Sequence, residues 1–101
     1  MDARLKEIIE IIVAYLDPVK IILFGSRVRG VSHDDADYDL AIVYDGVKSK
    51  REVTLGIYDQ FEDFDFSMDL FVLTTDEISR YKHIPNTLAR EVTEHGKVVY
   101  G

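Results

Sequence analysis

The chain has no cysteine, no tryptophan and only two prolines. The lack of cysteine excludes a disulfide scaffold, a thiolate zinc site and a cysteine nucleophile. Basic residues are also in the minority, because 12 Lys and Arg stand against 19 Asp and Glu. A formal charge of −7 argues against a protein that grips a phosphate backbone, since a basic surface dominates such binding. We therefore expect no direct contact with nucleic acid.

Long hydrophobic runs are missing as well. No stretch approaches the ~20 apolar residues that cross a bilayer, and the N-terminal segment mixes charged and apolar residues, unlike a signal peptide. These absences predict a cytoplasmic protein that does not contact membranes. The length of 101 residues predicts a single domain spanning 1–101, large enough for one hydrophobic core.

Helical and extended patterns alternate along the chain. Apolar residues at helical spacing predict a helix over 5–16, and a weaker pattern predicts another over 48–62. Short apolar runs predict strands over 19–24, 38–44, 64–73 and 97–100, with one helical turn over 26–30 and a polar loop over 31–36. Thr74 and Glu77 form a possible capping box for a short helix, and a last helix is expected from Asn86 to near residue 96. The alternation predicts an α/β or α+β sheet covered by helices.

Gly25-Ser26 directly follows a predicted strand and begins a helical turn. Glycine lets a ligand approach the backbone, and the free N–H groups of a helix start favour an anion. The Ser26 hydroxyl can donate to a phosphate oxygen, with Arg27 and Arg29 as nearby cations. The alternative is an ordinary strand–turn–helix junction in which Ser26 is the N-cap.

Asp37 and Asp39 stand at the head of the second predicted strand. Residues two apart on a strand point to the same side, roughly 6.5–7 Å apart, so these carboxylates repel each other unless a cation lies between them. Mg²⁺ suits such a pair, because it takes few protein carboxylates and completes its shell with phosphate and water. The alternative is a solvated acidic strand end.

Asp69 lies inside the apolar run FSMDLFVL, where an unpaired carboxylate is costly to bury unless it binds a metal. Its alternation with Met68 and Leu70 predicts that it lies at the edge of a pocket on the other face of the strand. A half-exposed strand is the alternative. Two other motifs fail: the glycines at 25 and 30 lack the lysine of a P-loop, and the acidic run at 35–39 lacks the glycine and glutamate of an EF-hand.

The combination of Gly25-Ser26, ten intervening residues, Asp37-x-Asp39 and a third strand with Asp69 resembles the DNA polymerase β-type nucleotidyltransferase superfamily. The run LFGSRVRG…DYDLAIV most resembles its minimal nucleotidyltransferases (MNT proteins), which are commonly encoded beside a helical HEPN partner. The resemblance implies a small mixed β-sheet covered by helices. The chain departs from the family at Ala36, where serine is common, and at Val28, where alanine is frequent; neither change removes a metal ligand.

The resemblance also implies a role for each motif residue. Gly25 and Ser26 would hold the β- and γ-phosphates of ATP or another nucleoside triphosphate, with Arg29 and Arg27 steadying the phosphate charge. Asp37 and Asp39 would bind two Mg²⁺ ions. Asp69 would bind the ion nearer the attacking group and help deprotonate a hydroxyl.

These roles predict an enzyme that transfers AMP from ATP to a hydroxyl. By resemblance, that hydroxyl belongs to a tyrosine of a HEPN-type toxin, which makes the chain an antitoxin. A partner or a second copy, as in a homo-oligomer, would complete the substrate site. The alternative is a catalytically silent module that neutralises its partner by stoichiometric binding. An adenylyltransferase for a small molecule, or an acidic domain without catalysis, is less favoured.

Overall fold

The strands form one mixed sheet in a computed structural model that describes residues 2–28, 37–61 and 65–101. Within these residues the strand order is β3-β2-β1-β4. β1 pairs antiparallel with β2 and β4, whereas β2 and β3 run parallel. The strands are β1 (Lys20–Phe24), β2 (Tyr38–Val43), β3 (Met68–Leu73) and β4 (Lys97–Tyr100). The predicted small mixed sheet is therefore confirmed.

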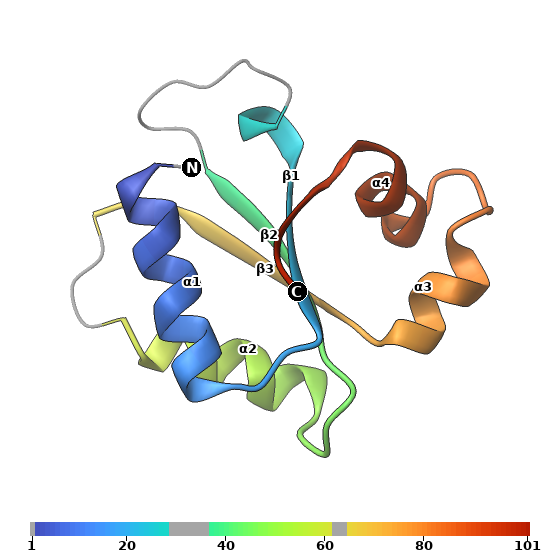
Figure 1. Cartoon of the computed structure of the whole chain (residues 1–101). Coiled ribbons are helices and arrows are strands. Elements are labelled where there is room, and N and C mark those ends of the chain that lie inside the picture. The colour runs from blue at the N-terminus through green and yellow to red at the C-terminus, as the bar shows by residue number, and fades with distance from the viewer. Residues whose placement is uncertain (1, 29–36, 62–64) are drawn as a thin grey trace.

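Helices cover both faces of this sheet (Figure 1). One face, called here the α1/α2 face, carries α1 (Ala3–Tyr15) and α2 (Lys50–Asp59). The other, the α3/α4 face, carries α3 (Thr75–Tyr81) and α4 (Leu88–His95). Each helix begins at a residue whose side-chain oxygen accepts a backbone N–H, which satisfies a donor that the first turn leaves unpaired. The four caps are Asp2, Ser49, Thr74 and Thr87.

The larger part of the core lies on the α1/α2 face, where the apolar stripe of α1 packs against alternate residues of the strands. Alternation along β2 places Tyr38, Leu40 and Ile42 in this cluster, whereas Ala41 and Val43 join the smaller cluster on the α3/α4 face. Asp39 belongs to the second set by the same alternation. A polar residue at the head of β2 is thus directed to the less covered side of the sheet.

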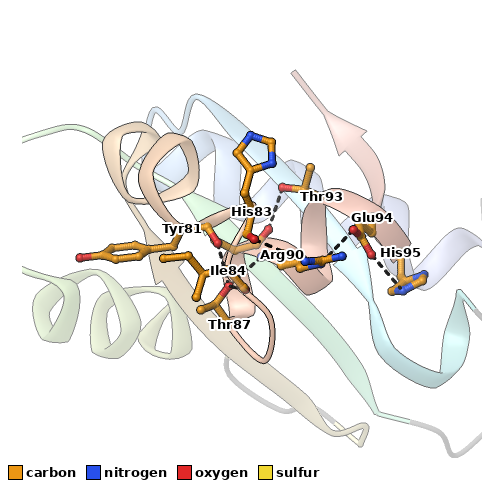
Figure 2. Close-up of polar contacts among 9 residues, drawn as sticks. Tyr81, His83, Ile84, Thr87, Arg90, Thr93, Glu94 and His95 are labelled. Carbon is orange, nitrogen blue, oxygen red and sulfur yellow. Dashed lines mark hydrogen bonds and ion pairs between the residues drawn. The ribbon is translucent and has the colours of Figure 1, made fainter.

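The corner between α3 and α4 is held by polar contacts (Figure 2). The hydroxyl of Thr87 lies 2.9 Å from the carbonyl oxygen of Tyr81 and 2.8 Å from that of Ile84. Arg90 of α4 donates through Nη1 to the carbonyl oxygen of His83 at 3.4 Å, and it also forms an ion pair with Glu94 within the same helix. These contacts fix the pair of helices that covers the α3/α4 face.

Several predicted boundaries are wrong, among them that of the second helix, which spans Lys50–Asp59 rather than 48–62. The third strand begins at Met68 rather than near residue 64, because Phe66 lies at a bend, with its ring edge-on to Tyr38 at 5.8 Å between centroids. The last helix begins after Thr87 rather than at Asn86, whose φ of 66° is not helical. The capping box of Thr74 is confirmed. The predicted loop over 31–36 lies outside the described residues.

Candidate active site

Gly25 brings the end of β1 directly against Asp39. Its φ of +80° lies in the left-handed region, which side chains disfavour. A Cβ atom at this position would collide with Asp39 Oδ2 and would lie 3.1 Å from Asp39 Cγ. Two features therefore require glycine at position 25: the left-handed backbone and the close approach of the Asp39 carboxylate.

Ser26 lies within the 3₁₀ turn η1 (Gly25–Arg27) that follows β1. The N-cap of this turn is Phe24, and no side chain caps it, so the interpretation of Ser26 as an N-cap is wrong. Its hydroxyl makes no hydrogen bond to any other residue that the structure describes. Ser26 is partly exposed beside Gly25.

Asp39 and Asp69 are brought side by side by the pairing of β2 with β3. The parallel register places Asp39 opposite Asp69, and the antiparallel register with β1 places Phe24 on the other side of Asp39. Directly opposite residues of paired strands point to the same face, which here is the α3/α4 face. Phe24 and Phe71 meet edge-on at 5.4 Å on that face, next to the carboxylates.

The electrostatics of the site reflect this proximity. Burial raises the pKa of Asp39 above its usual range, and the charges of Asp69 and Asp37 and a side-chain hydrogen bond with Asp69 raise it further. Asp37 itself is exposed, immediately before β2, and Asp69 is exposed on the edge strand β3. The charges of Asp37 and of Asp69 are thus each within electrostatic reach of Asp39.

Asp39 and Asp69 fit a divalent cation, because carboxylate oxygens are suitable ligands for Mg²⁺. Among residues 2–28, 37–61 and 65–101, no three His, Asp or Glu side chains gather closely enough to form a complete metal cage. Mg²⁺ does not require such a cage, because it is usually held by one or two carboxylates together with waters and substrate phosphates. Burial is the main cause of the raised pKa of Asp39, and a cation between Asp39 and Asp69 would remove the repulsion that adds to it.

Arg27 is placed differently from the other candidates. Its guanidinium carbon lies 3.8 Å from the ring centroid of Tyr38, and its Nη1 lies 3.7 Å from Asp2 Oδ2. Tyr38 packs on the α1/α2 face, so these contacts hold Arg27 on the side opposite the carboxylates. The Tyr38 hydroxyl donates to Asp2 Oδ1 at 3.2 Å and completes the cluster. Arg27 therefore joins η1 to β2 and to the start of α1.

Two further points concern what the sequence predicted around this cluster. Arg29, the other predicted phosphate-binding cation, lies outside the described residues. The contacts of Tyr38 and Asp2 with Arg27 were not predicted from the sequence. Alternation predicts that Tyr38 points inward between two aspartates, but no sequence signal indicates that it meets Arg27 there.

Comparison with known proteins adds independent information. The family model described as polymerase beta, nucleotidyltransferase, matches residues 6–101. A crystal structure from Sulfolobus solfataricus, of a protein assigned as a nucleotidyltransferase, has a TM-score of 0.61 with this chain at 23% identity. The alignment covers 93% of this chain and 74% of that one, which shows a shared fold. No curated protein matches the sequence. No helix in the described part of the chain is long and apolar enough to span a membrane.

Proposed function

The chain belongs to the polymerase beta nucleotidyltransferase family, and we propose on that basis that it transfers AMP from ATP to a protein hydroxyl with the help of Mg²⁺. The observation that carries the proposal is the register of β2 and β3. It sets Asp39 opposite Asp69, and Asp39 lies against the turn that holds Gly25 and Ser26. Carboxylates beside a phosphate-binding turn are the parts that nucleotidyl transfer needs.

Gly25 and Ser26 are the residues that would receive the triphosphate. The missing Cβ of Gly25 lets the Asp39 carboxylate lie directly against the turn, and the Ser26 hydroxyl can donate to a phosphate oxygen. Arg29 remains a proposed phosphate contact. For Arg27 the structure favours a supporting role, because its guanidinium is held over the Tyr38 ring on the other face.

The transfer itself is an in-line displacement at the α-phosphorus of ATP. The acceptor oxygen forms a bond to this phosphorus while the bond from phosphorus to the bridging oxygen of the β-phosphate breaks. Pyrophosphate leaves with the electron pair of that bond, and Asp69 takes the proton of the acceptor hydroxyl. Asp69 is suited to this task because it is exposed at the sheet edge, where an acceptor can reach it.

Asp37, Asp39 and Asp69 would hold the Mg²⁺ ions, two in number in this proposal. When bound, these ions neutralise the charge of the phosphate oxygens and of the pyrophosphate that leaves. The carboxylates would position the ions, because the strand pairing holds Asp39 and Asp69 opposite each other on adjacent strands. Asp39→Ala should therefore abolish transfer without unfolding the chain.

A HEPN-type toxin is the proposed acceptor protein, with a tyrosine hydroxyl as the accepting group and neutralisation of the toxin as the result. The net charge of −7 supports a basic partner, because complementary charge accelerates association. Asp37 and Asp69 are exposed, and we propose that a partner or a second copy of the chain completes the acceptor side of the site.

Purification of the tagged chain with its partner from the native host tests this proposal. The complex is incubated with Mg²⁺ and ATP, and the partner is examined by mass spectrometry for an added AMP. We expect adenylylation with the unaltered chain and none with Asp37→Ala or Asp39→Ala. Transfer that persists in the double variant contradicts the mechanism. A neutralised partner that never carries AMP favours a catalytically silent binding module instead.

A further inference from the structure

β3 is an edge strand, so half of its backbone groups have no neighbouring strand. The backbone N–H of Tyr38 donates to Ser67 O at 2.9 Å, and that of Tyr44 donates to Leu73 O at 2.9 Å. In a strand, the N–H and C=O of one residue point the same way and alternate with those of the next residue. The backbone of Asp69 therefore faces β2, whereas the backbone groups of Met68 and Leu70 face outward from the sheet.

Tyr58 of α2 supplies partners for the outward groups on both sides of Asp69. Its hydroxyl donates to the carbonyl oxygen of Met68 at 2.6 Å. The backbone N–H of Leu70 hydrogen-bonds the same hydroxyl oxygen. The Tyr58 hydroxyl thus pairs with the outward backbone groups on both sides of Asp69, as a neighbouring strand would.

Tyr58 is partly buried where it makes these contacts. The Tyr58 ring packs against the core of the α1/α2 face, beside Val53 and Ile57, which are fully buried in the same helix. Burial raises the pKa of Tyr58, and the charge of Asp69 raises it further, so the hydroxyl lies within electrostatic reach of that carboxylate. The phenol therefore stays protonated near neutral pH and can donate to Met68.

We propose that Tyr58 is a positioning residue for the metal centre, because it fixes the edge-strand backbone on both sides of Asp69. This inference rests on the proposed function of Asp69 as a metal ligand. Asp39 sits on a strand with neighbours on both sides, so its position needs no such support. Asp69 has a neighbouring strand on one side only, and α2 provides the restraint on the other.

Tyr58→Phe removes the hydroxyl and keeps the ring. Tyr44→Phe is the matched control: the Tyr44 ring packs against the same core, and its hydroxyl accepts the backbone N–H of Lys48 at 3.2 Å, away from the carboxylates. Mn²⁺ affinity is measured by calorimetry, and backbone hydrogen exchange of Leu70 by NMR. We expect Tyr58→Phe to weaken Mn²⁺ binding about 10-fold, as loss of a support behind a metal ligand does. Exchange at Leu70 should become faster in the same variant, and Tyr44→Phe should change neither quantity.

Unchanged Leu70 exchange in Tyr58→Phe overturns the inference, as does unchanged Mn²⁺ affinity or an equal loss in both variants. If the unaltered chain binds no Mn²⁺, the proposed metal centre fails together with the role of Tyr58. If it binds and Tyr58→Phe binds equally well, only the role of Tyr58 fails. If Tyr58→Phe does not fold, the inference can still be tested on the unaltered chain. Because coupling is reciprocal, Mg²⁺ should slow exchange at Leu70, and no slowing there contradicts the inference.

Discussion

Replacement of Gly25 by alanine tests whether the turn after β1 and the carboxylate of Asp39 form one site. The left-handed φ of +80° costs an alanine about 1–2 kcal/mol in the backbone alone. The new Cβ would also overlap Asp39 Oδ2, so the carboxylate must move. Unfolding measured by urea titration should show a loss of at least about 1 kcal/mol, which corresponds to a melting temperature roughly 5 °C lower.

The displacement of Asp39 should weaken Mn²⁺ binding and abolish transfer even at temperatures where the variant remains folded. Gly101→Ala serves as the control, since Gly101 also has a left-handed φ, of +96°, but packs beside Lys20 at the opposite end of β1. We expect the control to lose stability and to keep its Mn²⁺ affinity. If Gly25→Ala binds Mn²⁺ as tightly as the unaltered chain does, Asp39 is not a ligand at this turn.

Three other substitutions separate binding, catalysis and stability. Ser26→Ala should weaken nucleotide affinity in calorimetry about 10-fold, because a hydrogen bond to a charged group is lost, and should leave stability unchanged. Asp39→Asn should raise the melting temperature without Mg²⁺, because burial and the charges of Asp69 and Asp37 disfavour the Asp39 carboxylate and raise its pKa. The same variant should abolish transfer, and a lower melting temperature contradicts this reasoning. Lys50 Nζ donates a hydrogen bond of 2.7 Å to the Glu77 carboxylate and lowers the pKa of Glu77. This bond stabilises the fold at every pH above the usual pKa of a glutamate. The stabilisation is lost as the pH falls through the lowered pKa. Glu77→Gln should therefore cost about 0.5–1 kcal/mol at pH 7 in urea unfolding, and a deficit that persists in acid refutes this attribution.

Local patterns in the sequence predicted most of the elements. The apolar stripe of α1 predicted its buried face, and the spacing of Thr74 and Glu77 predicted the capping box of α3. Such features depend on residues within a few positions of one another, so their physical cause lies within the segment itself. The start of β3 was predicted too early because Phe66 fits an apolar strand pattern but packs instead against Tyr38.

The candidate site could be predicted only in its parts. The motif residues were identified from the sequence, but the register that sets Asp39 opposite Asp69 depends on the pairing of strands far apart in the chain. The same limit explains Arg27, whose contact with Tyr38 depends on which way η1 turns after β1. Tyr58 has the spacing of an ordinary helix residue, and nothing near it in the sequence indicates the edge strand that it contacts.

The fate of the α-phosphate of ATP tests the central claim most directly. The complex with its partner is incubated with Mg²⁺ and ATP labelled at the α- or the γ-phosphate, using the unaltered chain and the Asp37→Ala, Asp39→Ala double variant. The account predicts that the α-label alone appears on the partner, only with the unaltered chain, as the γ-label leaves in pyrophosphate. Label transferred from the γ-phosphate, or α-label transferred equally by the double variant, would contradict nucleotidyl transfer by these carboxylates.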